Sequence, residues 1–191
     1  VDAQGAYTEV LKRILLSKGG SGRFPRDDEF IQAFRERNFY NIQNYKFYLY
    51  DRLENGESRE RVNVAENLQN GTFSIEHIMP QTLSKDWISD LGESHEAIQE
   101  KWLNSIANLT LTAYNSNYSN RKFAEKRDMK NGFKDSGFRM NSFVNKQDTW
   151  GEAQLVQRER ILEKQFLELW PLANSNFEWP VTEQEERTLS D

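Results

Sequence analysis

The sequence contains no cysteine, four prolines and two histidines, His77 and His95, among its 191 residues. The absence of cysteine excludes disulfide bonds and cysteine-ligated zinc, and it fits a reducing compartment such as the cytoplasm. No apolar run approaches the roughly 20 residues that a membrane-spanning helix requires, and no stretch near residue 1 resembles a secretory signal peptide. We therefore expect a cytoplasmic protein without a membrane segment.

The composition supplies enough apolar material for one folded core. Hydrophobic residues make up 37% and aromatic residues 13% of the chain, whereas 29% of the residues are charged. A chain of this length is expected to form one domain of ordinary size, or one domain with a helical appendage. Because the first residue is Val1 rather than methionine, we expect the chain to be part of a longer protein.

Charge is distributed unevenly along the chain. The net charge of -5 argues against indiscriminate nucleic-acid binding by the whole surface. The segment from Thr112 to Lys146, by contrast, carries eight basic and only three acidic residues. Phosphate groups are therefore expected to dock on this segment. The basic side chains predicted to contact DNA are Arg121, Lys122, Lys126 and Arg127.

Apolar residues at helical spacing predict most of the secondary structure. The polar residues 57–71 are expected to form a loop, with one short strand around residues 62–64. His95 is expected to be an exposed residue at a helix start, with a second catalytic histidine as the alternative. Thr149 and Glu152 are predicted to form a capping box for the last helix. The expected helices cover residues 6–17, 27–37, 42–55, 83–91, 95–106, 119–130 and 149–170.

The helix expected over residues 42–55 is rich in aromatic side chains. Tyr45, Phe47, Tyr48 and Tyr50 fall within it. A row of aromatic side chains could stack nucleic-acid bases. At helical spacing such a row is more typical of a buried face, so we predict that these side chains belong to the core.

His77 stands at the centre of the most informative stretch, TFSIEHIMPQ. It follows a carboxylate, Glu76, in a short β-type run that Pro80 ends. Neighbouring residues of a regular strand point to opposite faces, so a kink before Pro80 is needed to bring both side chains to one site. The alternative interpretation of His77 is a buried core histidine bonded to the backbone.

A second strand and a loop of asparagines follow about thirty residues later in the chain. Residues 109–112 (LTLT) are typical of a short strand, and Asn115, Asn117 and Asn120 stand close together after it. Ser119 is a suitable N-cap for the helix expected next, whose free N–H groups could face a phosphate. Taken alone, the asparagines indicate only a tight turn.

A strand with histidine, a second strand, an asparagine loop and a helix form the layout of a ββα metal-dependent nuclease site. Hydrolysis of a phosphodiester requires a base that deprotonates water and a divalent cation that neutralises charge on the phosphate and the leaving oxygen. A histidine with a pKa near neutrality suits the first task. A hard ion such as Mg²⁺ takes oxygen ligands and keeps several waters, so one carboxylate and one amide oxygen suffice on the protein side.

The motif EHIMPQ, followed by NLTLT and an asparagine-rich segment leading into a lysine-containing helix, resembles the HNH (His-Me finger) nucleases. The longer pattern IEHIMPQTL…NLTLTAYNSNYSNRKFAEKRDM, within residues 23–171, resembles the C-terminal nuclease domain of GmrSD-type modification-dependent restriction enzymes. Two residues depart from the wider group. Glu76 replaces the more common aspartate, and Ala107 replaces a common glycine.

The resemblance implies a role for each polar residue of the motif. His77 corresponds to the general base, and Glu76 to the metal-binding acid that precedes it. Asn108 corresponds to the middle asparagine, whose side chain ties the loop that carries the histidine. The final metal-binding position falls on Asn117, nine residues after Asn108, with Asn115 and Asn120 as close rivals.

We expect an α+β fold that is mostly helical around a small ββα-metal (His-Me finger) module. Residues 1–71 form a helical N-terminal part and 72–130 the nuclease module, followed by a loop and packing helix over 131–171 and an acidic tail over 172–191. The predicted function is that of a DNA endonuclease dependent on Mg²⁺ or Mn²⁺, in a modification-dependent restriction or phage-defence protein. The resemblance implies modified or foreign DNA as a partner, and a nucleotide-using sensor domain outside this chain. The alternatives are a catalytically inactive DNA-binding module and an RNase or toxin nuclease.

Overall fold

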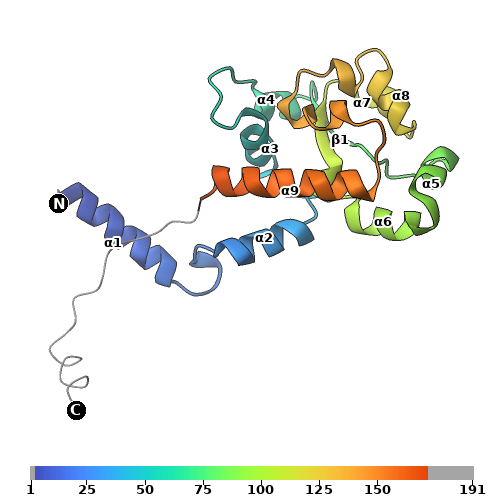
Figure 1. Ribbon diagram of the computed structural model, residues 1–191. Coiled ribbons are helices and arrows are strands. Elements are labelled where there is room, and N and C mark those ends of the chain that lie inside the picture. The colour runs from blue at the N-terminus through green and yellow to red at the C-terminus, as the bar shows by residue number, and fades with distance from the viewer. Residues whose placement is uncertain (1–2, 172–191) are drawn as a thin grey trace. The chain divides into compact units, whose positions relative to one another are not determined.

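The structure is a computed structural model that describes residues 3–171 (Figure 1). The chain divides into two compact units, and the unit Ile31–Trp170 contains every residue of the predicted site. The other unit contributes α1 (Ala3–Ser17) and a 3-10 turn at Gly20–Gly22. No helix in the described range is long and apolar enough to cross a membrane.

The unit Ile31–Trp170 is mostly helical and contains a small two-stranded antiparallel sheet, which confirms the predicted α+β class. Several of its helices are short, and 3-10 turns connect many of them. The helix Asp27–Glu36 has three acidic residues in its first turn, and their negative charge complements the positive end of the helix dipole. Helix α2 (Asp27–Glu36) crosses the boundary between the two units at Ile31. The other helices of this unit are α3 (Lys46–Asn55), α4 (Val64–Gln69), α5 (Lys85–Leu91), α6 (His95–Trp102), α7 (Asn115–Tyr118), α8 (Phe123–Asp128) and α9 (Glu152–Leu169).

The sheet pairs β1 (Ser74–His77) with β2 (Leu109–Thr112), as predicted from the alternation of both segments. In the register, Glu76 lies opposite Thr110 and His77 opposite Leu109. All four residues of β2 are buried, whereas β1 is buried only at its end, at Glu76 and His77. The sheet therefore carries the predicted acid and histidine into the interior.

Helix α9 lies below the sheet in Figure 1. Its buried face includes Arg158, which is 1% exposed. The guanidinium donates to the carbonyl of Ala107 at 2.8 Å and to the carbonyl of Met140 at 3.1 Å, so α9 is bonded to the 3-10 turn Ile106–Asn108 that precedes β2. A cluster of apolar residues surrounds this contact and includes Ile78, Met79, Trp87, Trp102, Phe123, Phe133, Trp150 and Leu155.

The short strand predicted around residues 62–64 is wrong, because α4 begins at Val64. Asn63 caps this helix: its Oδ1 accepts from the backbone N–H of Glu66 at 3.3 Å. Its Nδ2 in turn donates to the Glu66 carboxylate at 2.5 Å. An asparagine followed three residues later by glutamate is a helix-start pattern that overrides the β-branched valines.

The helix predicted over residues 119–130 is shorter in the structure, where α8 covers only Phe123–Asp128. Helix α7 ends at Tyr118, and Ser119 follows it with a positive φ of 44°, so Ser119 is not the N-cap of the next helix. Helix α8 begins only at Phe123, after Lys122. The segment predicted as a loop after residue 131 contains three 3-10 turns, at Phe133–Asp135, Arg139–Asn141 and Val144–Lys146.

The start of the last helix also differs from its prediction. Helix α9 begins after Gly151, whose N–H donates to Oε1 of Gln154 at 3.1 Å. Thr149 and Glu152 therefore do not form the predicted capping box. The predicted acidic tail, residues 172–191, lies outside the described residues.

The aromatic residues near α3 are only partly buried. Tyr50 is 0% exposed, as the core interpretation predicts. Tyr45, Phe47 and Tyr48 are 42%, 40% and 55% exposed, so the core interpretation is wrong for these three residues. Tyr48 accepts a hydrogen bond from the indole N–H of Trp170 at 3.0 Å, which assigns it a contact near the end of α9.

Candidate active site

A hollow of about 520 Å³ opens at the end of β1. Strand β1 contributes the acid and the histidine to the wall of the hollow, and the loop after β1 contributes further residues to it. The N-terminal part of α7 and the turn after it complete the hollow. Its lining residues are Tyr40, Ile75, Glu76, His77, Pro80, Gln81, Thr82, Asn115, Ser119 and Asn120.

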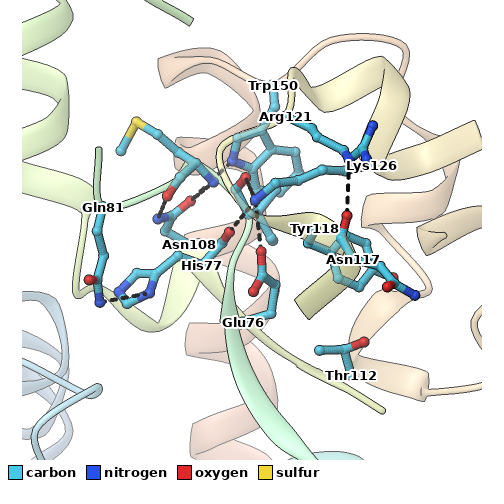
Figure 2. A network of polar contacts seen from close by, with 12 residues as sticks. Glu76, His77, Gln81, Asn108, Thr112, Asn117, Tyr118, Arg121, Lys126 and Trp150 are labelled. Carbon is cyan, nitrogen blue, oxygen red and sulfur yellow. Dashed lines mark hydrogen bonds and ion pairs between the residues drawn. The ribbon is translucent and has the colours of Figure 1, made fainter. Parts of the chain in front are cut away.

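The side chains of Glu76 and His77 have different partners although both residues line the hollow. Figure 2 shows the imidazole directed toward Gln81 and the carboxylate toward Lys126. Each of the two residues is 6% exposed. The alternation of the strand thus separates the two groups, and the hollow extends past both of them.

The imidazole of His77 is held from three sides. Its Nε2 lies 3.1 Å from Oδ1 of Asn104, and its Nδ1 lies 3.4 Å from Nε2 of Gln81. The ring of Tyr40 packs against it with centroids 4.4 Å apart. Because an amide oxygen only accepts hydrogen bonds, the contact with Asn104 assigns the proton of the neutral ring to Nε2 and leaves Nδ1 as the basic nitrogen.

Burial of His77 lowers its pKa from the ordinary value, and the charge of Lys126 acts in the same direction. The hydrogen bond that Nε2–H donates to Asn104 opposes this shift. The neutral imidazole therefore predominates at neutral pH. A neutral histidine with one fixed tautomer has the state that a general base requires.

Lys126 lies inside the protein and is 0% exposed. Its Nζ donates to Oε1 of Glu76 at 2.7 Å, to the carbonyl of His77 at 2.9 Å and to the carbonyl of Ile78 at 3.1 Å. All three ammonium donors are thus used. Helix α8 in this way fixes both the acid and the backbone carbonyls of the histidine and of the residue after it.

Burial shifts the pKa of both members of this pair toward the neutral forms. It raises the pKa of Glu76, and the adjacent ammonium of Lys126 opposes that shift. It likewise lowers the pKa of Lys126, and the carboxylate of Glu76 opposes that shift. Each charge therefore depends on its partner inside a site that water hardly reaches.

Asn108 connects the start of β2 to the chain that follows the histidine. Its Oδ1 accepts from the N–H of Met79 at 2.8 Å, and its Nδ2 donates to the Met79 carbonyl at 2.9 Å. Nδ2 also donates to the carbonyl of Leu103 at 3.1 Å, and the indole of Trp150 donates to Oδ1 at 3.3 Å. The side chain is fully buried and has no access to the hollow's solvent.

The three asparagines of the loop occupy different positions. Asn115 and Asn120 line the hollow, whereas Asn117 is not among the lining residues. The backbone of Asn117 is bonded elsewhere, to the carbonyl of Tyr114 at 2.9 Å and to Nε of Arg121 at 3.0 Å. The hollow therefore brings Asn115 and Asn120 together with Glu76 and His77.

The four basic residues predicted to contact DNA differ in accessibility. Lys126 is buried and bonds Glu76 and two carbonyls, so its predicted phosphate contact is wrong for this structure. The side chain of Arg127 is 18% exposed and is paired with Asp128 and Asp148. The side chains of Arg121 and Lys122 are 55% and 45% exposed, at 3.8 and 3.9 Å from the carboxylate of Glu125.

The donor atoms around the hollow suit a hard divalent cation. Glu76 supplies a carboxylate, and Asn115 and Asn120 supply amide oxygens. Mg²⁺ and Mn²⁺ prefer oxygen ligands, and Mg²⁺ retains several waters when the protein provides few ligands. Within the described range, no group of three or more histidine, cysteine, aspartate or glutamate side chains is placed to bind a metal.

Several residues of the site were not predicted from the sequence. Asn104, Gln81 and Tyr40 contact the imidazole of His77, although only Gln81 belongs to the EHIMPQ motif. His95 lies outside the hollow, at the first residue of α6, where Nδ1 is 3.0 Å from the carbonyl oxygen of Gly92. This position agrees with a helix-start residue.

Comparison with known protein families matches residues 24–165 to the family described as GmrSD restriction endonucleases, C-terminal domain. The matched range includes every residue of the hollow and both strands. No curated protein matches the chain. The family match confirms the resemblance found in the motifs of the sequence.

Proposed function

The chain belongs to the family of GmrSD restriction endonuclease C-terminal domains, and we propose that it is a metal-dependent DNA endonuclease of the His-Me finger type. Membership implies the nuclease domain of a restriction endonuclease, with DNA as substrate. One observation carries the finer proposal. The imidazole of His77 stands beside a hollow lined by Glu76, Asn115 and Asn120, and a side-chain contact fixes its tautomer.

His77 acts as the general base. Nδ1 takes a proton from a water molecule, and the oxygen of that water attacks the phosphorus while the bond to the leaving oxygen of the sugar breaks. Asn104 holds Nε2–H during this transfer and stabilises the imidazolium that forms, because its amide oxygen accepts from the protonated ring. With the proton on Nε2, the amide of Gln81 donates to Nδ1, so the attacking water would displace this contact, and the released amide is placed to orient that water.

Glu76, Asn115 and Asn120 are the residues that would hold the cation. A bound Mg²⁺ or Mn²⁺ supplies charge neutralisation at the phosphate and the leaving oxygen. The position of Asn117 outside the hollow favours Asn115 and Asn120 as the amide ligands. Lys126 bonds one of the two carboxylate oxygens of Glu76, Oε1, and thereby holds the carboxylate in one orientation.

Asn108 is a positioning residue in this account. Its two hydrogen bonds to Met79 hold the chain that leaves β1, two residues after His77. Arg121 and Lys122 are exposed and would contact phosphates without reading bases. A role in phage defence, with recognition of modified DNA by a separate nucleotide-using domain, is part of the proposal and rests on the family alone.

Plasmid cleavage by the purified chain tests this function. Supercoiled DNA is incubated with Mg²⁺ or Mn²⁺, with EDTA, and beside single-stranded RNA of matched length. Metal-dependent conversion of the plasmid to nicked or linear DNA, absent in EDTA, is the expected result. Binding without cleavage under any metal would indicate an inactive DNA-binding module, and preferential cleavage of RNA would indicate an RNase.

A further inference from the structure

Residues 37–45, the loop between α2 and α3, contribute one residue to the wall of the hollow. Tyr40 belongs to the lining of the hollow, and its ring packs on the imidazole of His77 at 4.4 Å. Lys46 follows the loop at the first position of α3, with its ammonium 6.0 Å from the centre of the Tyr40 ring. A chain of contacts thus runs from a lysine through a tyrosine to the proposed base.

The loop is anchored from within. Phe39 and Ile42 are each 4% exposed, and the ring of Phe39 packs edge-on against Phe34 at 5.6 Å and Phe166 at 5.9 Å. The N–H of Phe39 donates to the carbonyl of Asn104 at 2.9 Å. Asn104 is the residue whose side chain holds His77, so the same residue fixes the loop and the base relative to each other.

The positive charges next to this loop differ from those of the basic segment in their surroundings. Neither Arg37 nor Lys46 forms an ion pair with any acidic residue among those that the structure describes. The neighbouring carboxylate of Glu36 instead accepts a hydrogen bond from Gln32 at 3.2 Å. The exposed Arg121 and Lys122, by contrast, share the carboxylate of Glu125.

Aromatic rings accompany both of these cations. The guanidinium of Arg37 lies 5.8 Å from the centre of the Tyr45 ring, which is 42% exposed. Surfaces that bind a nucleic-acid strand combine cations for the phosphates with rings that contact bases and sugars. The loop has both, on a rigid support, at the edge of the hollow.

We propose that residues 37–46 form the surface that holds the DNA strand next to the phosphate being cut. Arg37 and Lys46 neutralise phosphates that flank the scissile one, and the exposed part of the Tyr40 ring contacts the adjacent nucleotide. This inference rests on the proposed nuclease function. It assigns substrate binding to a segment that lies before the recognisable motif and outside the basic segment of the sequence.

Salt-dependent binding tests the proposal with the full chain. Affinity for a fluorescein-labelled duplex is measured by anisotropy over a range of KCl concentrations, for the wild type, for Arg37→Ala with Lys46→Ala, and for Arg160→Ala with Lys164→Ala. The control pair lies on α9, removes the same charge and does not line the hollow. Each phosphate contact contributes about 0.9 to the slope of log affinity against log salt, so losing two contacts lowers the slope by about 1.8.

The loop variant is expected to show this smaller slope and the control variant the wild-type slope. Equal slopes for the loop variant and the wild type, with plasmid cleavage intact, would overturn the proposed surface while leaving the nuclease function in place. A wild type that neither binds nor cuts DNA would overturn both proposals. Tyr40→Phe is expected to retain wild-type affinity and Tyr40→Ala to lose at least threefold, while thermal unfolding shows that each variant is folded.

Discussion

The ammonium of Lys126 lies 2.7 Å from Oε1 of Glu76, and the two side chains are 0% and 7% exposed. This ion pair joins α8 to the end of β1, and the same ammonium bonds the carbonyls of His77 and Ile78. A charge that carries three hydrogen bonds in the interior holds the backbone around it in one conformation. The geometry of the proposed catalytic strand therefore depends on a helix about fifty residues further along the chain.

Replacing Lys126 by methionine is expected to destabilise the protein by about 3 to 5 kcal/mol, because the carboxylate of Glu76 would remain buried without a partner. Urea unfolding followed by tryptophan fluorescence measures this change. Adding Glu76→Gln to Lys126→Met is expected to recover part of the lost stability, since the unpaired charge is removed. Lys122→Met is the matched control, and a loss of similar size in that variant would contradict this account.

Replacing Asn108 by alanine is expected to cost about 3 kcal/mol or more, because the N–H of Met79 and two buried carbonyls lose their partners at roughly 1 kcal/mol or more each. Thermal unfolding measures the loss. Asn117→Ala, in an exposed position of α7, is expected to change stability by less than about 0.5 kcal/mol. Equal effects at the two positions would show that Asn108 does not carry this connection.

The lowered pKa of His77 predicts how cleavage depends on pH. Because the ring must be neutral to accept a proton, and burial lowers its pKa, activity is expected to persist below about pH 6.5, the ordinary histidine pKa, and to fall only as the pH passes through the lowered value. Asn104→Asp places a carboxylate beside Nε2 and raises this pKa, so the acid limb of the pH profile of kcat/KM should move to higher pH. An unchanged acid limb would argue against contact between Asn104 and the catalytic base.

Substitutions of the three asparagines of the loop are expected to differ in their effect on metal dependence. Asn115→Ala and Asn120→Ala should each raise the Mg²⁺ concentration that gives half-maximal cleavage, by about tenfold. Asn117→Ala should leave it unchanged, because Asn117 does not line the hollow. Calorimetric titration with Mn²⁺ provides a readout independent of activity. An effect confined to Asn117 would instead favour the nine-residue spacing predicted from the sequence.

The local patterns of the sequence predicted most of the helices, both strands and the class of fold, but they placed α4 and α7 in loops. Alternating apolar residues bounded by Pro80 indicated β1, and the run LTLT indicated β2. The prediction failed at residues 62–64 because the cap at Asn63 outweighed the β-propensity of two valines. It failed at Ser119 because this residue has a positive φ, and the helix begins only at Phe123.

The contacts of the site depended on tertiary structure that no local pattern contains. Lys126 lies in a basic segment whose composition is typical of a solvated helix face. In the structure its ammonium is buried, because it bonds Glu76 and two backbone carbonyls. Asn104 has no motif, and it meets His77 only because α6 ends beside β1. The motif thus identified the histidine, whereas the groups that orient it became visible only in the fold.

The most direct test compares His77→Ala with His95→Ala in a plasmid-cleavage assay with Mg²⁺, because these substitutions affect the only two histidines of the sequence. We expect His77→Ala to lose at least about a hundredfold in cleavage rate, as removal of a general base requires, and to retain DNA binding. His95→Ala, at a half-buried helix start outside the hollow, should cleave at the wild-type rate. Cleavage by His77→Ala at the wild-type rate would contradict the central claim that this imidazole activates the attacking water.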